Sequence, residues 1–444
     1  MRRKKKLYIE TYGCQMNFSD SEIVASIMRA RGYDVAEKAD HADVIMVNTC
    51  SIRDNAEQRV WKRLRELKSL KKRNISLQIG IIGCMAERLK EEILEEHLEV
   101  DFIAGPDSYR VLPDLIEAAV SGQQAANVVL SEEETYEDIH PVRLHSNGVS
   151  AFISIMRGCE NFCAYCVVPF TRGKERSRNP QTIIDEARTL FENGYREITL
   201  LGQNVNSYRW IDDNKDEINF PKLLKMVAQI DPVSRIRFTT SHPKDLSDEL
   251  LRVIAENENV CNAIHLAVQS GSTPVLERMN RKYTREYYLN RIAAIRSIIP
   301  DCAISTDIIA GFCDETEEDH QNTLSLMREA RFDYAFMFKY SERSGTIAAK
   351  KFEDNISDDV KGRRLEEIIE LQQEISLQSN QNDMGKIVEV LIEGQSKKST
   401  SQFMGRDDRN KVVVFDGIDL KKGDCVRVKI TKCTSATLIG EIVS

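Results

Sequence analysis

Three apolar runs near the start of the chain each end at a cysteine, and this pattern constrains the fold more than any other feature. Each run has the length and composition of a buried strand, and each is followed by helical periodicity. Alternating strands and helices predict a parallel sheet, in which the carboxyl ends of all strands lie along one edge. We therefore expect the three cysteines to converge there, although a single cysteine at a strand end is more often a small buried residue. The runs are residues 7–14, 42–50 and 76–84, which end at Cys14, Cys50 and Cys84, and the helical stretches are residues 19–32, 55–73 and 85–97.

The first of these helices carries boundary signals. Ser19 and Glu22 have the spacing of a capping box, in which two side chains bond backbone N–H groups at the start of a helix. Gly32 has the position of a residue that ends a helix in the left-handed conformation. These signals predict a helix that starts at Ser19 and ends just before Gly32.

A second set of cysteines lies close together in the sequence. Cys159, Cys163 and Cys166 follow a Cys-x-x-x-Cys-x-x-Cys spacing inside MRGCENFCAYCVVPFTRG. A cubane iron–sulfur cluster normally takes four thiolates, so a set of three leaves one iron with an open position for a small molecule. A structural zinc ion would need a fourth ligand nearby, and His145 and Cys261 are distant in sequence. The spacing therefore favours a reactive iron–sulfur site, and the same argument applies to the three cysteines at the strand ends.

From about residue 151 a six-fold alternation of strand and helix predicts an incomplete (β/α) barrel. In such barrels the chemistry lies at the carboxyl ends of the strands, and here those ends carry polar residues or glycine. Loop capping is the alternative interpretation for each of these residues. The expected strands are residues 151–156, 197–203, 235–241, 263–269, 303–311 and 334–340, and the residues at their ends are Gly202, Gln203, Ser241, His242, Gln269, Ser270 and the segment 307–311.

The pattern changes again at the end of the chain. Short alternating segments over residues 386–443, punctuated by Gly and Asp, predict a small all-β barrel. Residues 383–441 hold 11 Lys or Arg and 9 Asp or Glu, a net charge of +2, whereas the whole chain carries −8. This asymmetry favours an RNA partner, although a charge of +2 is weak support by itself.

Length and composition indicate a large enzyme with several domains that stays inside the cell. The chain has 444 residues, enough for about two to four domains. No apolar run approaches the roughly 18 residues of a membrane span, and the apolar stretch after the charged start is too short for a signal peptide. Eleven cysteines without a secretion signal favour reduced thiols over disulfides. We expect a cytoplasmic protein with no membrane partner.

Several strings of the sequence resemble those of a known family. RGCENFCAYC resembles the cluster loop of the radical S-adenosylmethionine (SAM) enzymes, and VVPFTRGKERSR after it is similar to the methylthiotransferase family within them. YGCQMNFSDSE, NTCSIR and the Gly83–Cys84 pair resemble the N-terminal domain of that family, and GRDDRNKVVVF resembles its RNA-binding TRAM domain. The resemblance implies an N-terminal parallel α/β domain at residues 1–130, a linker at 131–148, a radical SAM barrel at 149–376 and an OB-like TRAM domain at 380–444.

The resemblance implies SAM and two [4Fe–4S] clusters as cofactors. In the family, the open iron of one cluster chelates SAM, and an auxiliary cluster holds the sulfur that is transferred. The implied ligands are Cys159, Cys163 and Cys166 for the first cluster and Cys14, Cys50 and Cys84 for the auxiliary cluster. The implied SAM contacts are Tyr165, which could also simply pack, together with Gly202, Gln203, Ser241, Gln269, Ser270 and Asp307.

The sequence departs from the family pattern at two places. Cys313 and Asp314 stand where the family usually has Pro-Gly, and Ala267 stands where a proline is common. We expect both departures to affect loop stiffness more than chemistry.

Basic residues beside the cluster loop and in the terminal barrel are candidates for RNA contacts. Those beside the cluster loop could instead form internal salt bridges. The candidates are Arg172, Arg176, Arg178, Lys397, Lys398 and Arg406, and Lys174 lies in the same basic stretch.

The activity implied by the resemblance is methylthiolation of C2 of N6-isopentenyladenosine at position 37, in the anticodon stem-loop of tRNA. One SAM molecule would methylate sulfur on the auxiliary cluster, and a second would yield the 5′-deoxyadenosyl radical that abstracts the C2 hydrogen. The enzyme would act as a monomer with an outside electron donor such as a flavodoxin. The alternatives are a methylthiotransferase acting on threonylcarbamoyladenosine or on a ribosomal-protein aspartate, and a non-enzymatic iron–sulfur protein that binds RNA or carries sulfur.

Overall fold

The structure is a computed structural model that describes residues 3–51, 54–97, 99–144, 147–212, 214–396 and 401–443. The chain divides into two compact units. The first unit holds residues 1–145, 156–162 and 166–182, and the second holds residues 146–155, 163–165 and 183–444. Every helix in the described part is too short or too polar to cross a membrane.

A six-stranded parallel sheet forms the centre of the first unit, in the order β2-β1-β3-β4-β5-β6. The three strands expected from the sequence are β1, β3 and β4, and they confirm the predicted parallel sheet. The sequence pattern does not predict β2, β5 and β6, because strands of two or three residues show no periodicity. The strands are β1 (Lys6–Tyr12), β2 (Asp34–Val35), β3 (Val44–Thr49), β4 (Gln78–Ile82), β5 (Phe102–Ala104) and β6 (Ala125–Asn127).

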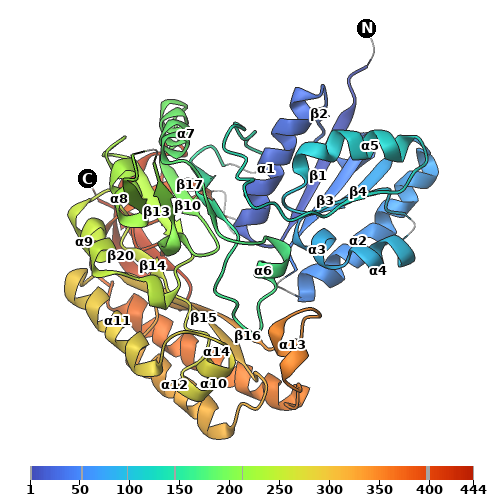
Figure 1. Ribbon diagram of the computed structural model, residues 1–444. Coiled ribbons are helices and arrows are strands. Elements are labelled where there is room, and N and C mark those ends of the chain that lie inside the picture. The colour runs from blue at the N-terminus through green and yellow to red at the C-terminus, as the bar shows by residue number, and fades with distance from the viewer. Residues whose placement is uncertain are drawn as a thin grey trace. The chain divides into compact units, whose positions relative to one another are not determined.

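Helices cover both faces of this sheet (Figure 1). Val24 of α1 and Ile116 of α5 are buried in the core on one face. Leu64 of α2 and Ile93 of α4 are buried in the core on the other face. The helices are α1 (Gln15–Ala30), α2 (Asp54–Arg73), α3 (Cys84–Arg88), α4 (Lys90–Glu96) and α5 (Leu112–Val120), and short 3₁₀ turns lie at Ala39–His41 and Tyr109–Val111.

The predicted start of the first helix is wrong. α1 begins at Gln15, with Cys14 at its N-cap, so Ser19 and Glu22 lie inside the helix and form no capping box. Both residues are buried, and the Glu22 carboxylate pairs with Arg143 at 2.8 Å. The chain therefore turns from β1 directly into α1, and the cysteine lies at the turn.

The end of α1 is as predicted. Gly32 adopts φ +85°, and the Tyr33 N–H donates to the Met28 carbonyl at 3.1 Å, which closes the last turn of the helix. The helix predicted over residues 85–97 is instead two short helices, α3 and α4, with Leu89 between them.

Six parallel strands form the incomplete barrel of the second unit, as predicted (Figure 1). They make two three-stranded sheets, ordered β13-β10-β7 and β14-β15-β16. Isolated parallel bridges, Ile236 with Val260 and Ser241 with Leu266, join the two sheets. The strands are β7 (Ser150–Ser154), β10 (Glu197–Leu201), β13 (Arg235–Thr239), β14 (Ala263–His265), β15 (Ala303–Ala310) and β16 (Tyr334–Lys339).

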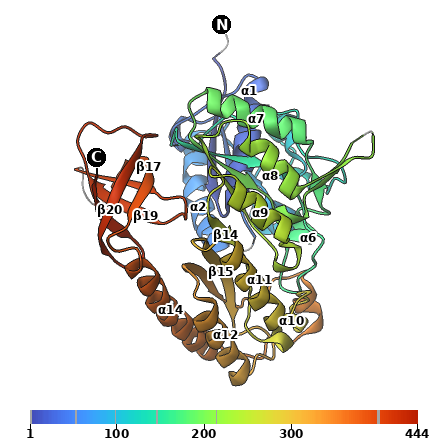
Figure 2. The ribbon, with the colours of Figure 1, turned by 90° about the vertical axis from the view of Figure 1, so that its left-hand side faces the viewer.

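Helices alternate with these strands and pack outside them (Figure 2). They are α7 (Pro180–Glu192), α8 (Phe220–Ala228), α9 (Asp248–Glu256), α10 (Thr273–Arg278), α11 (Arg285–Ile298), α12 (Glu317–Ala330), α13 (Ile347–Lys351) and α14 (Asp358–Gln381). Shorter elements of this unit are β11 (Arg209–Ile211) and β12 (Glu217–Asn219), with 3₁₀ turns at Val205–Ser207 and Pro243–Asp245. The short elements β8 (Met156–Arg157), α6 (Val168–Thr171) and β9 (Arg176–Ser177) belong to the first unit.

The long helix α14 leads into a closed five-stranded barrel, which confirms the predicted all-β fold at the end of the chain (Figure 2). Its strands are ordered β17-β18-β19-β21-β20 around a small core that includes Val390, Ile392 and Phe415. The strands are β17 (Ile387–Gln395), β18 (Gln402–Arg406), β19 (Val412–Asp416), β20 (Cys425–Cys433) and β21 (Leu438–Ile442).

Candidate active site

The cysteines of the first unit lie at one edge of its sheet. Cys14 follows β1, Cys50 follows β3 and Cys84 follows β4, so the carboxyl ends of three parallel strands carry them. Cys50 and Cys84 are buried, and Cys14 is partly buried at the N-cap of α1. The convergence expected from the sequence pattern is therefore present.

Two glycines allow the cysteine loops to approach one another. Gly13 has φ +120°, and a Cβ on it would overlap the Cβ of Cys50. Gly83 has φ +90°, and a Cβ on it would overlap the side-chain oxygen of Asn48. Both positions combine a left-handed backbone with a contact that leaves no room for a side chain, so each requires glycine.

A pair of buried asparagines ties the first two cysteine loops together. Asn17 Nδ2 donates to Asn48 Oδ1 at 3.0 Å, and Asn48 Nδ2 returns a bond to the Asn17 carbonyl at 2.8 Å. The Cys14 thiol donates to Asn17 Oδ1 at 3.0 Å. Neither asparagine carries a signal in the sequence that marks this role, although both lie in strings that resemble the family.

The environment of these thiols suits metal-bound thiolates. A hydrogen bond from Cys50, followed by the charge of Arg172, lowers the pKa of Cys14 to about 6 against the opposing effect of burial. Burial raises the pKa of Cys84, while the neighbouring Arg172 acts in the opposite direction. Three sulfur donors in a buried, glycine-lined edge beside a cation fit a thiolate-ligated iron–sulfur cluster.

A buried ion network lies beside this edge. Asp20 accepts from Arg157 Nη1 at 2.8 Å and from Arg172 Nη2 at 2.6 Å. Asp107 accepts from Arg176 Nη2 at 3.0 Å and lies 3.6 Å from Arg157 Nε. All five side chains are at least nine-tenths buried.

These contacts correct the RNA interpretation of the basic stretch. Arg172 and Arg176 form internal ion pairs, and Arg178 is buried and donates to the Thr182 hydroxyl at 2.9 Å. A buried guanidinium cannot reach an RNA phosphate, so internal pairing is the interpretation that the structure supports. Lys174 of the same stretch is exposed and pairs with Glu132 at 2.7 Å.

The second cysteine set lies between β8 and α6, within the eight residues 159–166. In the first unit, Cys159 accepts a hydrogen bond at its sulfur from Asn161 Nδ2 at 3.3 Å. In the second unit, the sulfur of Cys163 accepts from Arg281 Nη1 at 3.3 Å. N–H donors and a cation beside cysteine sulfurs suit thiolate ligands, and the loop with its three cysteines fits an iron–sulfur cluster.

The residues expected to contact SAM lie in the second unit, mostly at the carboxyl ends of the barrel strands. Gly202 and Gln203 follow β10, and Ser241 follows β13. The Ser241 hydroxyl donates to Asn206 Oδ1 at 3.0 Å, while the buried Gln203 Oε1 has no hydrogen-bond partner among the described residues. Tyr165 packs against the buried cluster that contains Ala164 and Phe312.

Gln269 and its neighbours continue this edge. Gln269 has φ +71°, and its N–H donates to the Asp307 carbonyl at 2.8 Å. A left-handed non-glycine residue stores strain, which often accompanies a ligand site. Asp307 lies within β15 and bonds His265 Nε2 at 3.3 Å, and the Ser270 hydroxyl lies 3.3 Å from that of Thr323.

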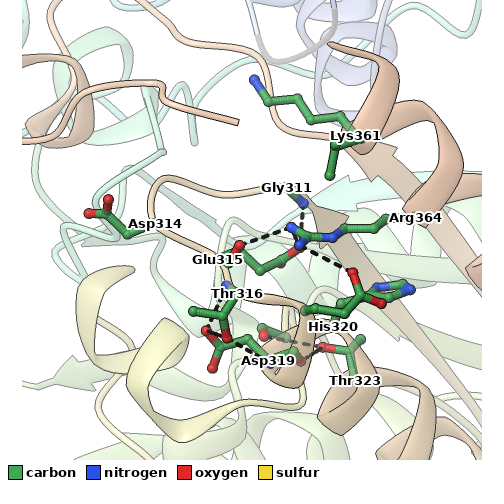
Figure 3. Close-up of polar contacts among 12 residues, drawn as sticks. Gly311, Asp314, Glu315, Thr316, Asp319, His320, Thr323, Lys361 and Arg364 are labelled. Atoms are coloured by element: carbon green, nitrogen blue, oxygen red, sulfur yellow. Dashed lines mark hydrogen bonds and ion pairs between the residues drawn. The ribbon is translucent and has the colours of Figure 1, made fainter. Parts of the chain in front are cut away.

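The loop after β15 departs from the family pattern, and the structure shows how it is held (Figure 3). Glu315 accepts from the Gly311 N–H at 2.9 Å and from Arg364 Nη1 at 2.9 Å. Asp314 adopts φ +56°, a conformation that favours glycine, and exchanges two hydrogen bonds with Asn355, at 2.6 and 3.0 Å. The asparagine therefore supports a backbone that Pro-Gly would adopt without strain.

One further group in the described residues has the composition of a metal site. Glu317, His320 and Glu367 could each supply a ligand atom. Arg363 already bonds both carboxylates, at 2.7 Å to Glu317 and 2.6 Å to Glu367. Because this guanidinium already occupies both carboxylates, we assign no metal to this group.

The five-stranded barrel is fastened to the amino ends of the barrel strands in the second unit. Arg235, at the start of β13, donates to the Arg406 carbonyl at 2.6 Å. Arg237 donates to the carbonyls of Asp407 and Asp408, at 2.7 and 2.8 Å. The Arg406 side chain pairs with Glu393 at 3.1 Å. Lys397 and Lys398, the other RNA candidates here, lie outside the described residues.

Comparison with known families divides the chain into three matched segments. Residues 6–105 match the Uncharacterized protein family UPF0004, residues 153–327 match the Radical SAM superfamily and residues 382–443 match the TRAM domain.

Curated relatives match along the full length. The tRNA-2-methylthio-N(6)-dimethylallyladenosine synthase of Amoebophilus asiaticus is 57% identical over 99% of this chain and 92% of its own. Enzymes of the same name from Bacteroides thetaiotaomicron and Phocaeicola vulgatus are 57% and 58% identical, each over 99% of this chain and 96% of their own.

Solved structures share the fold at low identity. The radical SAM methyltransferase TsrM from Kitasatospora setae gives a TM-score of 0.54 at 12% identity, over 76% of this chain and 73% of its own. The cobalamin-dependent radical SAM enzyme OxsB gives 0.55 at 11% identity, over 83% and 56%.

Proposed function

Because the chain belongs to the family of tRNA-2-methylthio-N(6)-dimethylallyladenosine synthases, we propose that it methylthiolates C2 of N6-isopentenyladenosine, also called N6-dimethylallyladenosine, at position 37 of tRNA. It is a radical SAM enzyme. SAM serves both as the methyl donor and as the source of a 5′-deoxyadenosyl radical.

Two [4Fe–4S] clusters are part of the proposal. The chemistry that the bound groups supply is reductive cleavage of SAM and delivery of a methylated sulfur. One observation supports this assignment most: three strand-end cysteines meet at one sheet edge, in a chain that also carries the Cys-x-x-x-Cys-x-x-Cys loop. We assign Cys159, Cys163 and Cys166 to the SAM-binding cluster and Cys14, Cys50 and Cys84 to the auxiliary cluster.

The remaining residues of the site support the cluster cysteines and would hold SAM. Asn161 and Arg281 donate hydrogen bonds to the sulfurs of Cys159 and Cys163, which stabilises thiolates. The strand-end residues would hold SAM: Gln203 offers an amide oxygen without a partner among the described residues, and the strained backbone at Gln269 supports a ligand contact there. The proposed SAM contacts are Tyr165, Gly202, Gln203, Ser241, Gln269, Ser270 and Asp307.

The partners follow from the substrate. We propose that the anticodon stem-loop of tRNA binds through the TRAM domain, with Lys397, Lys398 and Arg406 as candidate contacts. An outside electron donor such as a flavodoxin would reduce the SAM-binding cluster. We also propose that the enzyme is a cytoplasmic monomer with the domain division expected from the sequence. The relatives are named as tRNA-modifying enzymes, which supports the cytoplasmic location.

Anaerobic incubation of the reconstituted protein with SAM, dithionite and tRNA bearing isopentenyladenosine tests this function, with nucleoside mass spectrometry as the measurement. A methylthio product at position 37 is expected, with 5′-deoxyadenosine formed alongside it. Formation of 5′-deoxyadenosine with an unchanged nucleoside would overturn the substrate. Absence of both products from protein that carries both clusters would overturn the enzymatic assignment.

A further inference from the structure

Arg172 reaches directly into the cysteine edge of the first unit. Its Nε donates to the Cys84 sulfur at 3.2 Å, and its Nη2 donates to Asp20 at 2.6 Å. Its side chain is 3% exposed, and the buried Nη1 has no hydrogen-bond partner among the described residues. A buried donor without an acceptor costs about 1–3 kcal/mol, so Nη1 fits an acceptor that a bound group would supply.

The carboxylate of Asp20 holds the guanidinium of Arg172 in place. Asp20, on α1 six residues after Cys14, is fully buried and also bonds Arg157 at 2.8 Å and the Tyr109 hydroxyl at 3.2 Å. A carboxylate held on three sides leaves Arg172 little freedom. Its Nε therefore stays against the Cys84 sulfur.

The charges of the buried network do not balance without the cysteines. Arg157, Arg172 and Arg176 supply three positive charges, and Asp20 and Asp107 supply two negative charges. Burial and then the charge of Asp107 raise the pKa of the neighbouring Glu87 to about 7, which disfavours a third negative charge there. An uncompensated buried cation is strongly destabilising. An oxidised [4Fe–4S] core with three thiolates carries about one net negative charge, which matches the excess.

We propose that Arg172 is a positioning residue of the auxiliary cluster, which bonds the Cys84 sulfur and offsets the negative charge of the cluster. The inference rests on the two-cluster assignment made above. Reduction adds one negative charge to a cluster, so a fixed cation and an N–H···S bond raise its reduction potential. Arg172 follows Cys166 by six residues, and α6 packs against α3, which begins at Cys84. The segment that carries Cys159 and Cys166 therefore also supplies a supporting group to the auxiliary site.

The test measures the auxiliary cluster alone, in the full-length chain with Cys159, Cys163 and Cys166 replaced by Ala. Arg172→Gln is introduced into this parent, and the midpoint potential is read from an EPR-monitored redox titration. We expect the reduction equilibrium to fall at least tenfold, about 59 mV for one electron. Arg176→Gln is the matched control, because it removes an equally buried charge from the same network without a contact to a cysteine, and its shift should be smaller. Arg172→Lys keeps the positive charge, so it should fold even if Arg172→Gln does not. Its midpoint potential should lie between those of the parent and Arg172→Gln.

Other outcomes would overturn the inference. Equal potentials in the parent and in both Arg172 variants would remove the role of Arg172 while leaving the two-cluster assignment intact. Absence of iron from the parent would overturn that assignment, and this inference with it. A weaker affinity of Arg172→Gln for tRNA with an unchanged potential, matched by Lys174→Gln, would restore the phosphate-binding interpretation instead.

Discussion

The guanidinium of Arg281 lies 3.3 Å from the sulfur of Cys163 and donates a hydrogen bond to it. Arg281 is buried and also bonds the Ala267 carbonyl at 2.6 Å and the Tyr283 hydroxyl at 2.8 Å, so its position is fixed. We expect Arg281→Gln to slow 5′-deoxyadenosine formation from SAM about 10- to 100-fold, the usual effect of losing a group that supports a ligand. Chromatography of the dithionite-driven reaction measures this rate. Arg278→Gln is the control, because Arg278 lies nearby in sequence and contacts no cysteine among the described residues. It should retain the rate, and an equal loss in both variants would contradict the prediction.

The two cysteine sets should separate the two activities. Cys14→Ala should abolish methylthiolation while leaving some cleavage of SAM, because it removes a ligand of the proposed auxiliary cluster alone. Cys163→Ala should abolish both products. Nucleoside mass spectrometry and 5′-deoxyadenosine analysis on one reaction mixture measure both. Survival of either product in Cys163→Ala would sink the ligand assignment.

Gly83→Ala should disrupt the auxiliary site without unfolding the chain. Its new methyl group would overlap Asn48, which holds the loop of Cys14 through Asn17. We expect bound iron to fall from about eight to about four atoms per chain. Gly122→Ala is the control, since Gly122 has a similar φ of +85° with no atom within 4 Å of the added group. It should cost about 1 kcal/mol of stability and no iron, and full iron in Gly83→Ala would contradict the prediction.

Asp314→Ala should destabilise the second unit by about 1 kcal/mol, because it loses the bond from Asn355 and keeps a strained left-handed backbone. Asp314→Gly should cost less, since glycine relieves the strain. Thermal denaturation followed by circular dichroism compares the two. Equal melting temperatures would show that the backbone at this position carries no strain.

His242 should make the stability depend on pH. Burial, and then the charges of Arg281 and Lys244, lower its pKa to about 2. The folded protein therefore keeps His242 neutral, whereas the unfolded chain takes up a proton below about pH 6.5. The neutral His242 therefore contributes fully to the free energy of unfolding above pH 6.5. Below pH 6.5 this free energy falls by about 1.4 kcal/mol for each pH unit. Melting temperatures between pH 7.5 and 5.5 should fall more steeply for the native protein than for His242→Gln, and parallel slopes would refute this.

The sequence predicts the sheet and the barrels because long apolar runs and helical periodicity are local signals. It also places Cys14, Cys50 and Cys84 at a common edge, since parallel topology determines where strand ends lie. It misplaces the start of α1, because the Ser19 and Glu22 spacing occurs by chance inside the helix. Basic residues show no partner in sequence alone: Asp20 lies 152 residues before Arg172, so only the folded chain distinguishes an ion pair from a phosphate contact.

The attachment of the terminal barrel determines how an RNA substrate would be presented. Arg235 and Arg237 hold its residues 406–408 against the amino ends of the strands, while the residues proposed to bind SAM lie mostly at the carboxyl ends. These hydrogen bonds fix the position of the terminal barrel against the strands, so it is not joined to them by a flexible linker alone. A tRNA bound to this barrel, as proposed, would lie at a distance from the proposed SAM-binding residues that the fold itself sets, and its binding would not first have to order a linker.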